Sequence, residues 1–121
     1  METIAKILIS IIALEHLYFM YFGMFAWETI GKKTFKSLPK DVFKPTKGLA
    51  ANQGLYNGFL SAGLIWSFFI NDIHWQKNIA TFFLLFVIIA GVFGAVTASK
   101  KIFFVQALPA ILALVFLLIS K

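Results

Sequence analysis

Cysteine is absent from the 121 residues, and charged residues are scarce. Without cysteine the chain can form no disulfide, no thiolate metal site and no cysteine nucleophile. Charged side chains make up 13% of the sequence, about half of the roughly 25% found in soluble proteins. Hydrophobic residues make up 60%, and the mean hydropathy is +0.88. These proportions predict a membrane protein.

Motifs that bind phosphates or metals, or that activate nucleophiles, are also missing. The sequence has no Gly-rich phosphate loop, no metal-binding His/Glu repeat and no nucleophile elbow, so we expect no metal and no cofactor. The formal charge of +6 is of the sign found in nucleic-acid-binding proteins. The chain lacks the length to build a folded basic surface beside its apolar segments, and we therefore expect no nucleic-acid partner.

What the sequence does contain is long apolar segments separated by short polar ones. A transmembrane helix needs about 20 residues, so four such segments use about two thirds of the chain and leave room for one domain. We place the spans at residues 4–27, 48–70, 79–98 and 102–120. The expected fold is all-α, an integral membrane four-helix bundle.

The first apolar segment carries an acid and a histidine near its middle. A cleaved signal peptide is the alternative interpretation, but Glu15 and His16 interrupt its apolar region and no small-x-small cleavage site follows. An ionised carboxylate at that depth costs roughly 2.5–3.5 kcal/mol or more, so acids inside membranes are functional candidates. Helical spacing lets Glu15 and His16 both face the protein interior, while Leu14, Leu17 and Tyr21 face lipid.

Between residues 28 and 47 the density of charge rises sharply, and two prolines mark a loop. Six lysines are interleaved there with Phe35, Leu38, Val42 and Phe43. Such interleaving is typical of a segment that lies on the anionic headgroups of a lipid bilayer. A merely solvated loop is the alternative.

Lysine counts predict how the spans are oriented. The loops at residues 28–47 and 99–101 hold eight lysines, whereas the two ends and residues 71–78 together hold three. Because short basic loops stay on the cytoplasmic side, both termini are expected outside. This arrangement describes a multi-pass protein of the cytoplasmic membrane.

The second segment opens with Leu49–Phe59, which mixes amides and glycines with apolar residues. At about 100° per residue, one helix face collects the polar residues Asn52, Gln53, Tyr56, Asn57 and Ser61. Gly54 and Gly58 occupy the next sector and favour close contact within the bundle over contact between subunits, although a homo-oligomer stays open. A second arc of small residues lies in the third segment, at Ala90, Gly91, Gly94, Ala95 and Ala98.

Polar residues of different segments are expected to lie at similar depths in the bilayer. With the first helix descending and the second ascending, the helical rise puts Asn57 at nearly the depth of Glu15. Gln53 and Gln106 lie about one or two turns nearer the cytoplasm. We therefore expect a polar pocket that opens from the middle of the bilayer toward the basic loops. Pro109 removes one backbone hydrogen bond and is expected to kink the last helix beside Gln106.

The predicted site residues are Glu15, His16, Asn52, Gln53, Tyr56, Asn57 and Gln106. The alternative is structural, because amides in membrane helices often serve only as interhelical hydrogen bonds worth about 0.6 kcal/mol each. Burial opposes ionisation of Glu15 and hydrogen bonds from Asn57, Gln53 or Tyr56 favour it, so the sequence leaves its charge open. We interpret His74, in the outer link, as a surface residue.

Several motifs in this chain resemble those of one protein family. They are Ala13–Tyr18, Met24–Trp27, Leu49–Phe59 and Phe104–Ala110. Together they extend over nearly the whole chain and resemble the family called domain of unknown function 1304. The resemblance implies a small bacterial integral membrane protein of about this length, and it implies no activity.

Three functions fit these residues. The first is binding or transport of a small or amphipathic ligand, with Glu15 and His16 as a protonation-coupled pair. Small four-span multidrug exporters also place a glutamate in the first helix, but they tolerate inverted pairs, whereas the eight-to-three lysine ratio here argues for one orientation.

The second is a structural or accessory membrane subunit. The third is an intramembrane enzyme acting on a lipid-like substrate, with Glu15 or His16 as general base. No second acid lies at matching depth, and one Glu with one His gives at most two metal ligands. We favour binding or transport.

Overall fold

The computed structural model describes residues 1–120, and every regular element in that range is helical. The α-helices are α1 (Thr3–Phe25), α2 (Lys32–Thr34), α3 (Lys47–Ser67), α4 (Ile73–Thr97) and α5 (Leu108–Ile119). Two π-helical segments, η1 (Trp27–Gly31) and η3 (Phe103–Ala107), and one 3-10 turn, η2 (Lys40–Val42), lie between them. The all-α fold class is confirmed. Residues 1–120 form five α-helices rather than the expected four, because α2 is an additional single turn.

The contacts divide the chain into two compact units. We call Met1–Leu14 with Leu60–Lys121 the core unit, and Glu15–Phe59 the hairpin unit. Helices α1 and α3 each contribute one part to each unit, because the division falls within both helices. Each unit has its own packing, and the two are described in turn.

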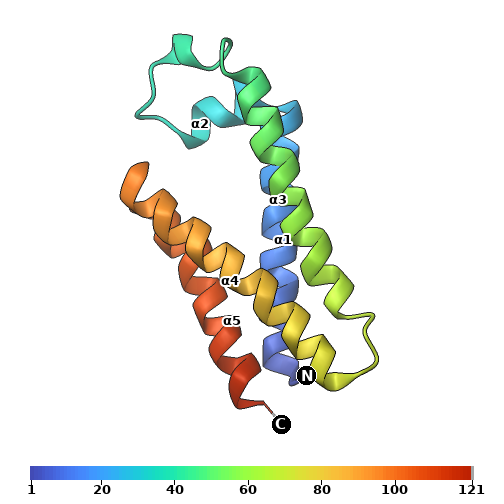
Figure 1. Ribbon diagram of the computed structural model, residues 1–121. Helices are drawn as coiled ribbons and strands as arrows, with labels where there is room; N and C mark the ends of the chain where they lie inside the picture. Colours follow the sequence, from blue (N-terminus) through green and yellow to red (C-terminus); the bar gives the residue numbers. More distant parts are fainter. Residues whose placement is uncertain (121) are drawn as a thin grey trace. The chain divides into compact units, whose positions relative to one another are not determined.

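The core unit is built around a cluster of buried aliphatic side chains from α1, α3, α4 and α5. The cluster consists of Ala5, Ile9, Ile12, Ala13, Leu64, Ala80, Leu84, Val87, Ala110, Ala113 and Leu117. Helices α4 and α5 run side by side in opposite directions (Figure 1). The Lys77 ammonium of α4 donates a hydrogen bond to the Ser120 carbonyl just beyond α5, which satisfies one of the free acceptors at that helix end.

Small residues set the approach of α4 to η3 in the core unit. A Cβ atom at Gly91 would lie 2.7 Å from the Ala107 nitrogen, so only glycine fits there. The Leu108 N–H bonds to the Phe103 carbonyl, five residues earlier, which is the π-helical pattern. A π-helical segment therefore includes Gln106 and Pro109 follows it as the second residue of α5, while the kink expected there stays a prediction.

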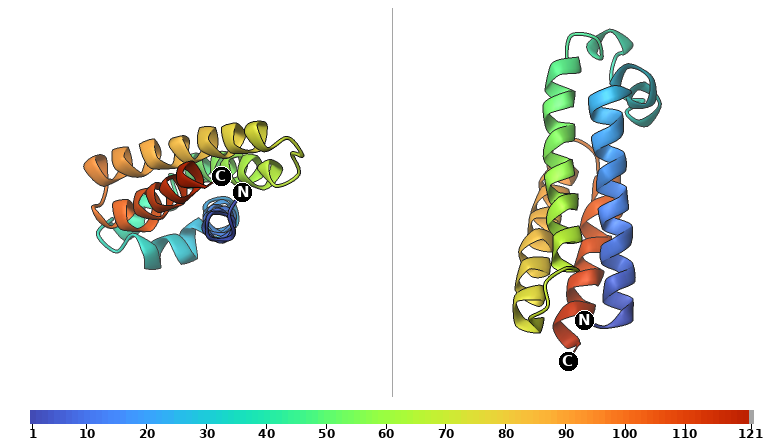
Figure 2. Two further views of the ribbon diagram at one scale, coloured as in Figure 1. Left: turned by 90° about the horizontal axis from the view of Figure 1, so that it is seen from below. Right: turned by 90° about the vertical axis from the view of Figure 1, so that its right-hand side faces the viewer.

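The hairpin unit holds the second part of α1 and the first part of α3, which run antiparallel (Figure 2, right). Their backbones touch at glycines. A Cβ atom at Gly23 would lie 2.9 Å from the Ala50 carbonyl oxygen and 3.0 Å from the Gly54 Cα. One at Gly58 would lie 2.5 Å from the Met20 sulfur. The predicted use of Gly54 and Gly58 for helix contact within the chain is confirmed.

Two helix boundaries differ by several residues from the ends of the predicted spans. Helix α3 ends at Ser67 rather than at residue 70, and α4 begins at Ile73 rather than at residue 79. The Asp72 carboxylate accepts a 3.0 Å hydrogen bond from the Trp75 N–H, which is an N-cap. Residues 73–78 of the predicted link 71–78 therefore belong to α4. A search for apolar runs does not detect this helix start, because it is partly polar and its signal is the capping side chain of Asp72.

The predicted loop of residues 28–47 is also more ordered than its lysines and prolines suggest. It contains the helical segments η1, α2 and η2. We call residues 27–47 the basic cap. Its prolines stand where they do not interrupt these segments, Pro39 directly before η2 and Pro45 after it.

Among residues 1–120, α1 and α4 are long and apolar enough to cross a membrane, by length and composition alone. The apolar stretch Phe103–Ile119 is shorter. Helix α3 has the length, but its amides and glycines lower its apolarity. Two possible membrane-spanning helices are thus present, and the four-span bundle stays a prediction.

Candidate functional site

Glu15 lies in the middle of α1, at the beginning of the hairpin unit. Its side chain is half-buried, and its Oε1 atom is shielded from solvent. No group among residues 1–120 donates a hydrogen bond to that oxygen. A buried acceptor without a donor costs about 1–3 kcal/mol, and more when it is charged. Glu15 is therefore held in place at the expense of stability.

His16, the next residue along α1, is 1% exposed. Its imidazole meets the Phe19 ring edge-on, with ring centroids 5.2 Å apart. Phe19 in turn meets Phe22 at 6.1 Å, and Phe22 stacks on Trp27 at 6.4 Å. A continuous series of ring contacts thus runs along α1 from the histidine to the basic cap. The expected interior position of His16 is confirmed; of the three residues predicted to face lipid, Leu14 and Tyr21 are exposed and Leu17 is partly buried.

The predicted polar residues of α3 belong to the same unit as Glu15, but most of them are exposed. Asn52, Gln53 and Tyr56 lie on the exposed side of the helix. Asn57 is half-buried, and its Nδ2 donates to the Gln53 carbonyl, 3.1 Å away in the preceding turn. None of these groups donates to Glu15 Oε1. The pocket that they were expected to line with Glu15 stays a prediction.

Gln106, the last predicted site residue, is half-buried in η3 and belongs to the core unit. In that unit Ser61 is fully buried, and its hydroxyl donates a 2.7 Å hydrogen bond to the Ala13 carbonyl of α1. Ser61 stands four residues after Asn57 on the polar face of α3. Its hydroxyl joins two helices, the structural role offered above as the alternative for the amides.

An open groove of about 400 Å³ runs along α4 in the core unit. Its lining residues are Ile88, Ile89, Val92, Phe93 and Val96. All five are apolar, so the groove can contact hydrocarbon but offers a ligand no hydrogen bond. It is a different feature from the polar site predicted around Glu15.

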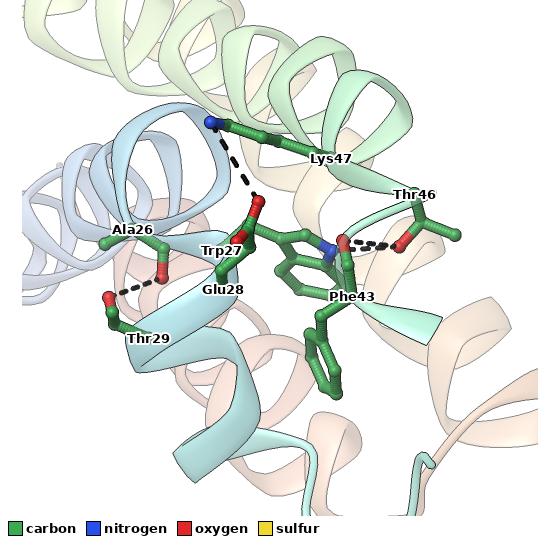
Figure 3. Close-up of polar contacts among 7 residues, drawn as sticks. All are labelled: Ala26, Trp27, Glu28, Thr29, Phe43, Thr46 and Lys47. Atoms are coloured by element: carbon green, nitrogen blue, oxygen red, sulfur yellow. Dashed lines mark hydrogen bonds and ion pairs between the residues drawn. The ribbon is translucent and has the colours of Figure 1, made fainter. Parts of the chain in front are cut away.

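Trp27 organises the basic cap (Figure 3). Its indole nitrogen donates a 3.0 Å hydrogen bond to the Thr46 hydroxyl, which donates in turn to the Val42 carbonyl at 2.7 Å. Its ring lies 4.9 Å from that of Phe43 and 5.7 Å from that of Phe35, centroid to centroid. The sequence analysis assigned Trp27 no role, because its partners lie up to 19 residues away.

The comparison with known sequences identifies the family. The sequence profile of a family described as "Protein of unknown function (DUF1304)" matches residues 10–118. The chain belongs to the DUF1304 family. The resemblance seen in the sequence motifs is thereby confirmed.

The DUF1304 chain is also similar to the uncharacterized protein YpaA of Lactococcus lactis subsp. lactis (strain IL1403). The two are 34% identical over 116 residues, which cover 93% of this chain and 96% of that protein. No solved structure matches the chain.

The chemistry open to this DUF1304 chain follows from its few titratable groups. Among residues 1–120, no three His, Asp or Glu side chains lie close enough to hold a metal ion. Glu15 offers one buried acceptor. Such an acceptor can bind a cation or a hydrogen-bond donor.

Proposed function

We propose that this DUF1304 chain is a multi-pass membrane protein that binds or transports a small cationic or amphipathic ligand through Glu15. The membrane location is supported by the apolar composition and by α1 and α4, the two helices long and apolar enough to span. The ring contacts from His16 toward the basic cap give the ligand an apolar and aromatic surrounding on the same helix.

The observation that carries the proposal is the buried Oε1 of Glu15 without a donor. Glu28, on the same hairpin, lies 4.0 Å from the Lys47 ammonium at a partly exposed position. Glu15 has no such partner within residues 1–120. An intramembrane acid is expensive and marks a functional site by default, and a bound cation supplies the missing partner.

An accessory membrane subunit is the second candidate, and a different observation favours it. Asn52, Gln53 and Tyr56 are exposed on α3. If α3 spans the bilayer, these polar groups need hydrogen-bond partners that lipid cannot supply. A helix of another chain, or of a second copy, would provide them. An intramembrane enzyme acting on a lipid-like substrate ranks third.

Binding of the lipophilic cation tetraphenylphosphonium to the purified protein in detergent micelles tests the proposal. Glu15→Gln keeps the size of the side chain and one acceptor oxygen but removes its charge, so we expect binding at least tenfold weaker. Glu2→Gln is the matched control, because it makes the same charge change at an exposed residue and is expected to bind as the wild type does.

Accumulation of the same cation in proteoliposomes under an imposed proton gradient separates binding from transport when it is compared with protein-free liposomes, because this lipophilic cation also crosses bilayers unaided. Equal binding by the wild type and Glu15→Gln would remove Glu15 from the mechanism. A wild type that binds no cation would count against the ligand site and favour the accessory subunit.

A further inference from the structure

The basic cap concentrates positive charge on a short segment. Residues 27–47 hold six lysines and two carboxylates, a net charge of +4. All six lysines are exposed, and among residues 1–120 only Lys47 of the six lies within ion-pair distance of a carboxylate, that of Glu28. The remaining five ammonium groups are available to an outside partner.

Apart from Leu38 and the two prolines, the apolar residues of the basic cap are buried or partly buried. Phe43 is 1% exposed and packs on Trp27. A Cβ atom at Gly31 would lie 2.7 Å from the Trp27 ring, so the last residue of η1 packs tightly on the indole of its first residue. With the Trp27–Thr46 hydrogen bond, these contacts give the segment a fixed fold. The lysines are therefore presented by a small folded scaffold, so the premise that the chain is too short for a folded basic surface is wrong.

One apolar residue breaks this pattern. Leu38 is 40% exposed in the turn between α2 and η2, next to Pro39. Lys36 and Lys40 stand on either side of it and are exposed. An exposed leucine between lysines matches the boundary between headgroups and acyl chains, where cations meet phosphates and an apolar side chain enters the hydrocarbon.

We propose that the basic cap is a docking surface for the anionic headgroups of the bilayer, with Lys33, Lys36 and Lys40, the three lysines nearest Leu38 in the sequence, as the main contacting cations. The partner is chosen by charge complementarity, since a lysine near an anionic membrane surface contributes about 1 kcal/mol, or roughly fivefold in affinity. This inference rests on the proposed membrane location but not on a ligand at Glu15.

Electron paramagnetic resonance of spin-labelled lipids tests the inference in phosphatidylcholine proteoliposomes. The fraction of label immobilised by the protein is compared for phosphatidylglycerol and phosphatidylcholine. We expect the wild type to prefer phosphatidylglycerol at least fivefold, and 1 M NaCl to abolish the preference by screening. The triple variant K33Q/K36Q/K40Q keeps Lys32, Lys44 and Lys47 and is expected to prefer it at least threefold less than the wild type does.

Two control variants separate charge from position. K33R/K36R/K40R keeps the charges and is expected to keep the preference. K6Q/K100Q/K101Q removes three lysines outside the basic cap and is expected to keep most of it. Circular dichroism checks that each variant retains the helical content of the wild type.

Three results would overturn the inference. A wild type without a preference for phosphatidylglycerol refutes the docking surface. A preference that K33Q/K36Q/K40Q retains refutes its assignment to the basic cap. If neither label is immobilised, the membrane location itself fails, and the cation-binding measurement in micelles then decides separately whether Glu15 binds a ligand.

Discussion

Gly23 and Gly54 set how closely α1 and α3 approach in the hairpin unit. The Cβ of an alanine at position 54 would lie 3.0 Å from the Met20 carbonyl oxygen and 3.1 Å from the Met24 nitrogen, and both of these are backbone atoms. Because backbone cannot move aside as a side chain can, Gly54→Ala is expected to destabilise the protein by about 1–3 kcal/mol. Thermal unfolding followed by circular dichroism in detergent micelles measures the change.

Gly48→Ala is the matched control for that prediction. It lies in the same helix, and a Cβ there would meet nothing within 4 Å. Alanine has the higher helix propensity, by up to about 1 kcal/mol, so this variant is expected to be as stable as the wild type or more stable. Equal effects of the two substitutions would show that propensity, rather than the α1–α3 contact, governs position 54.

Glu15 and Glu28 show how differently the same residue type is used within one hairpin. The Glu28 side chain is partly exposed and lies near Lys47 in an ion pair of the kind that contributes little to stability. Glu15 keeps one oxygen buried with no donor. Loss of Glu28 is therefore expected to be a minor surface change, whereas loss of Glu15 removes the buried oxygen on which the proposed ligand site rests.

At the scale of elements, the basic cap depends on Trp27. Trp27→Ala removes three ring contacts and the bond to Thr46. Replacing a fully buried tryptophan by alanine lowers the stability of a protein by about 3–5 kcal/mol. Trp27 is only partly buried, so we expect a smaller loss. A local loss of about 2 kcal/mol raises the open population roughly thirtyfold, so trypsin is expected to cleave at the cap lysines at least tenfold faster.

Trp66→Ala serves as the control for proteolysis of the basic cap. Trp66 is 54% exposed in α3 and belongs to the core unit. The same loss of an aromatic ring there is expected to leave cleavage at the cap lysines unchanged. Equal acceleration by both variants would mean that the cap opens only when the whole protein unfolds.

The sequence predicted those elements whose signal is local and repeated. Long apolar runs predicted the helices that became α1, α3 and α4, and small residues at helical spacing predicted their contacts, as at Gly54 and Gly91. The sequence analysis did not predict the folded basic cap, because Trp27 and Thr46 are 19 residues apart and no local pattern indicates the hydrogen bond between them. The start of α4 had a local signal in Asp72, which an apolar window does not register.

At the scale of the whole molecule, composition predicted the class but not the site. The scarcity of charge and the spacing of the apolar runs are sufficient for an all-α chain. Composition and spacing do not reveal which residues each polar side chain contacts. Ser61 and Asn52 belong to one predicted face, yet Ser61 is buried and bonds to Ala13, whereas Asn52 is exposed. Helical periodicity places a side chain on a face, and only the packing decides what that face meets.

The topology of the chain is a prediction that its lack of cysteine makes accessible to experiment. Single cysteines introduced as Ser37→Cys, Asn71→Cys and Ala98→Cys fall at exposed residues in the three successive connections. From the lysine bias, a membrane-impermeant maleimide is expected to label position 71 in intact cells. It is expected to label positions 37 and 98 only in inverted membrane vesicles.

The pair of positions 37 and 71 decides whether α3 crosses the membrane. The topology depends most on α3, because α1 and α4 are apolar enough to span a membrane whereas α3 carries exposed amides. Labelling of both positions from one side would leave α3 at the surface, and its polar face would then need only water. Labelling from opposite sides would place Asn52, Gln53 and Tyr56 inside the bilayer, where their hydrogen-bonding groups require a ligand or a second chain.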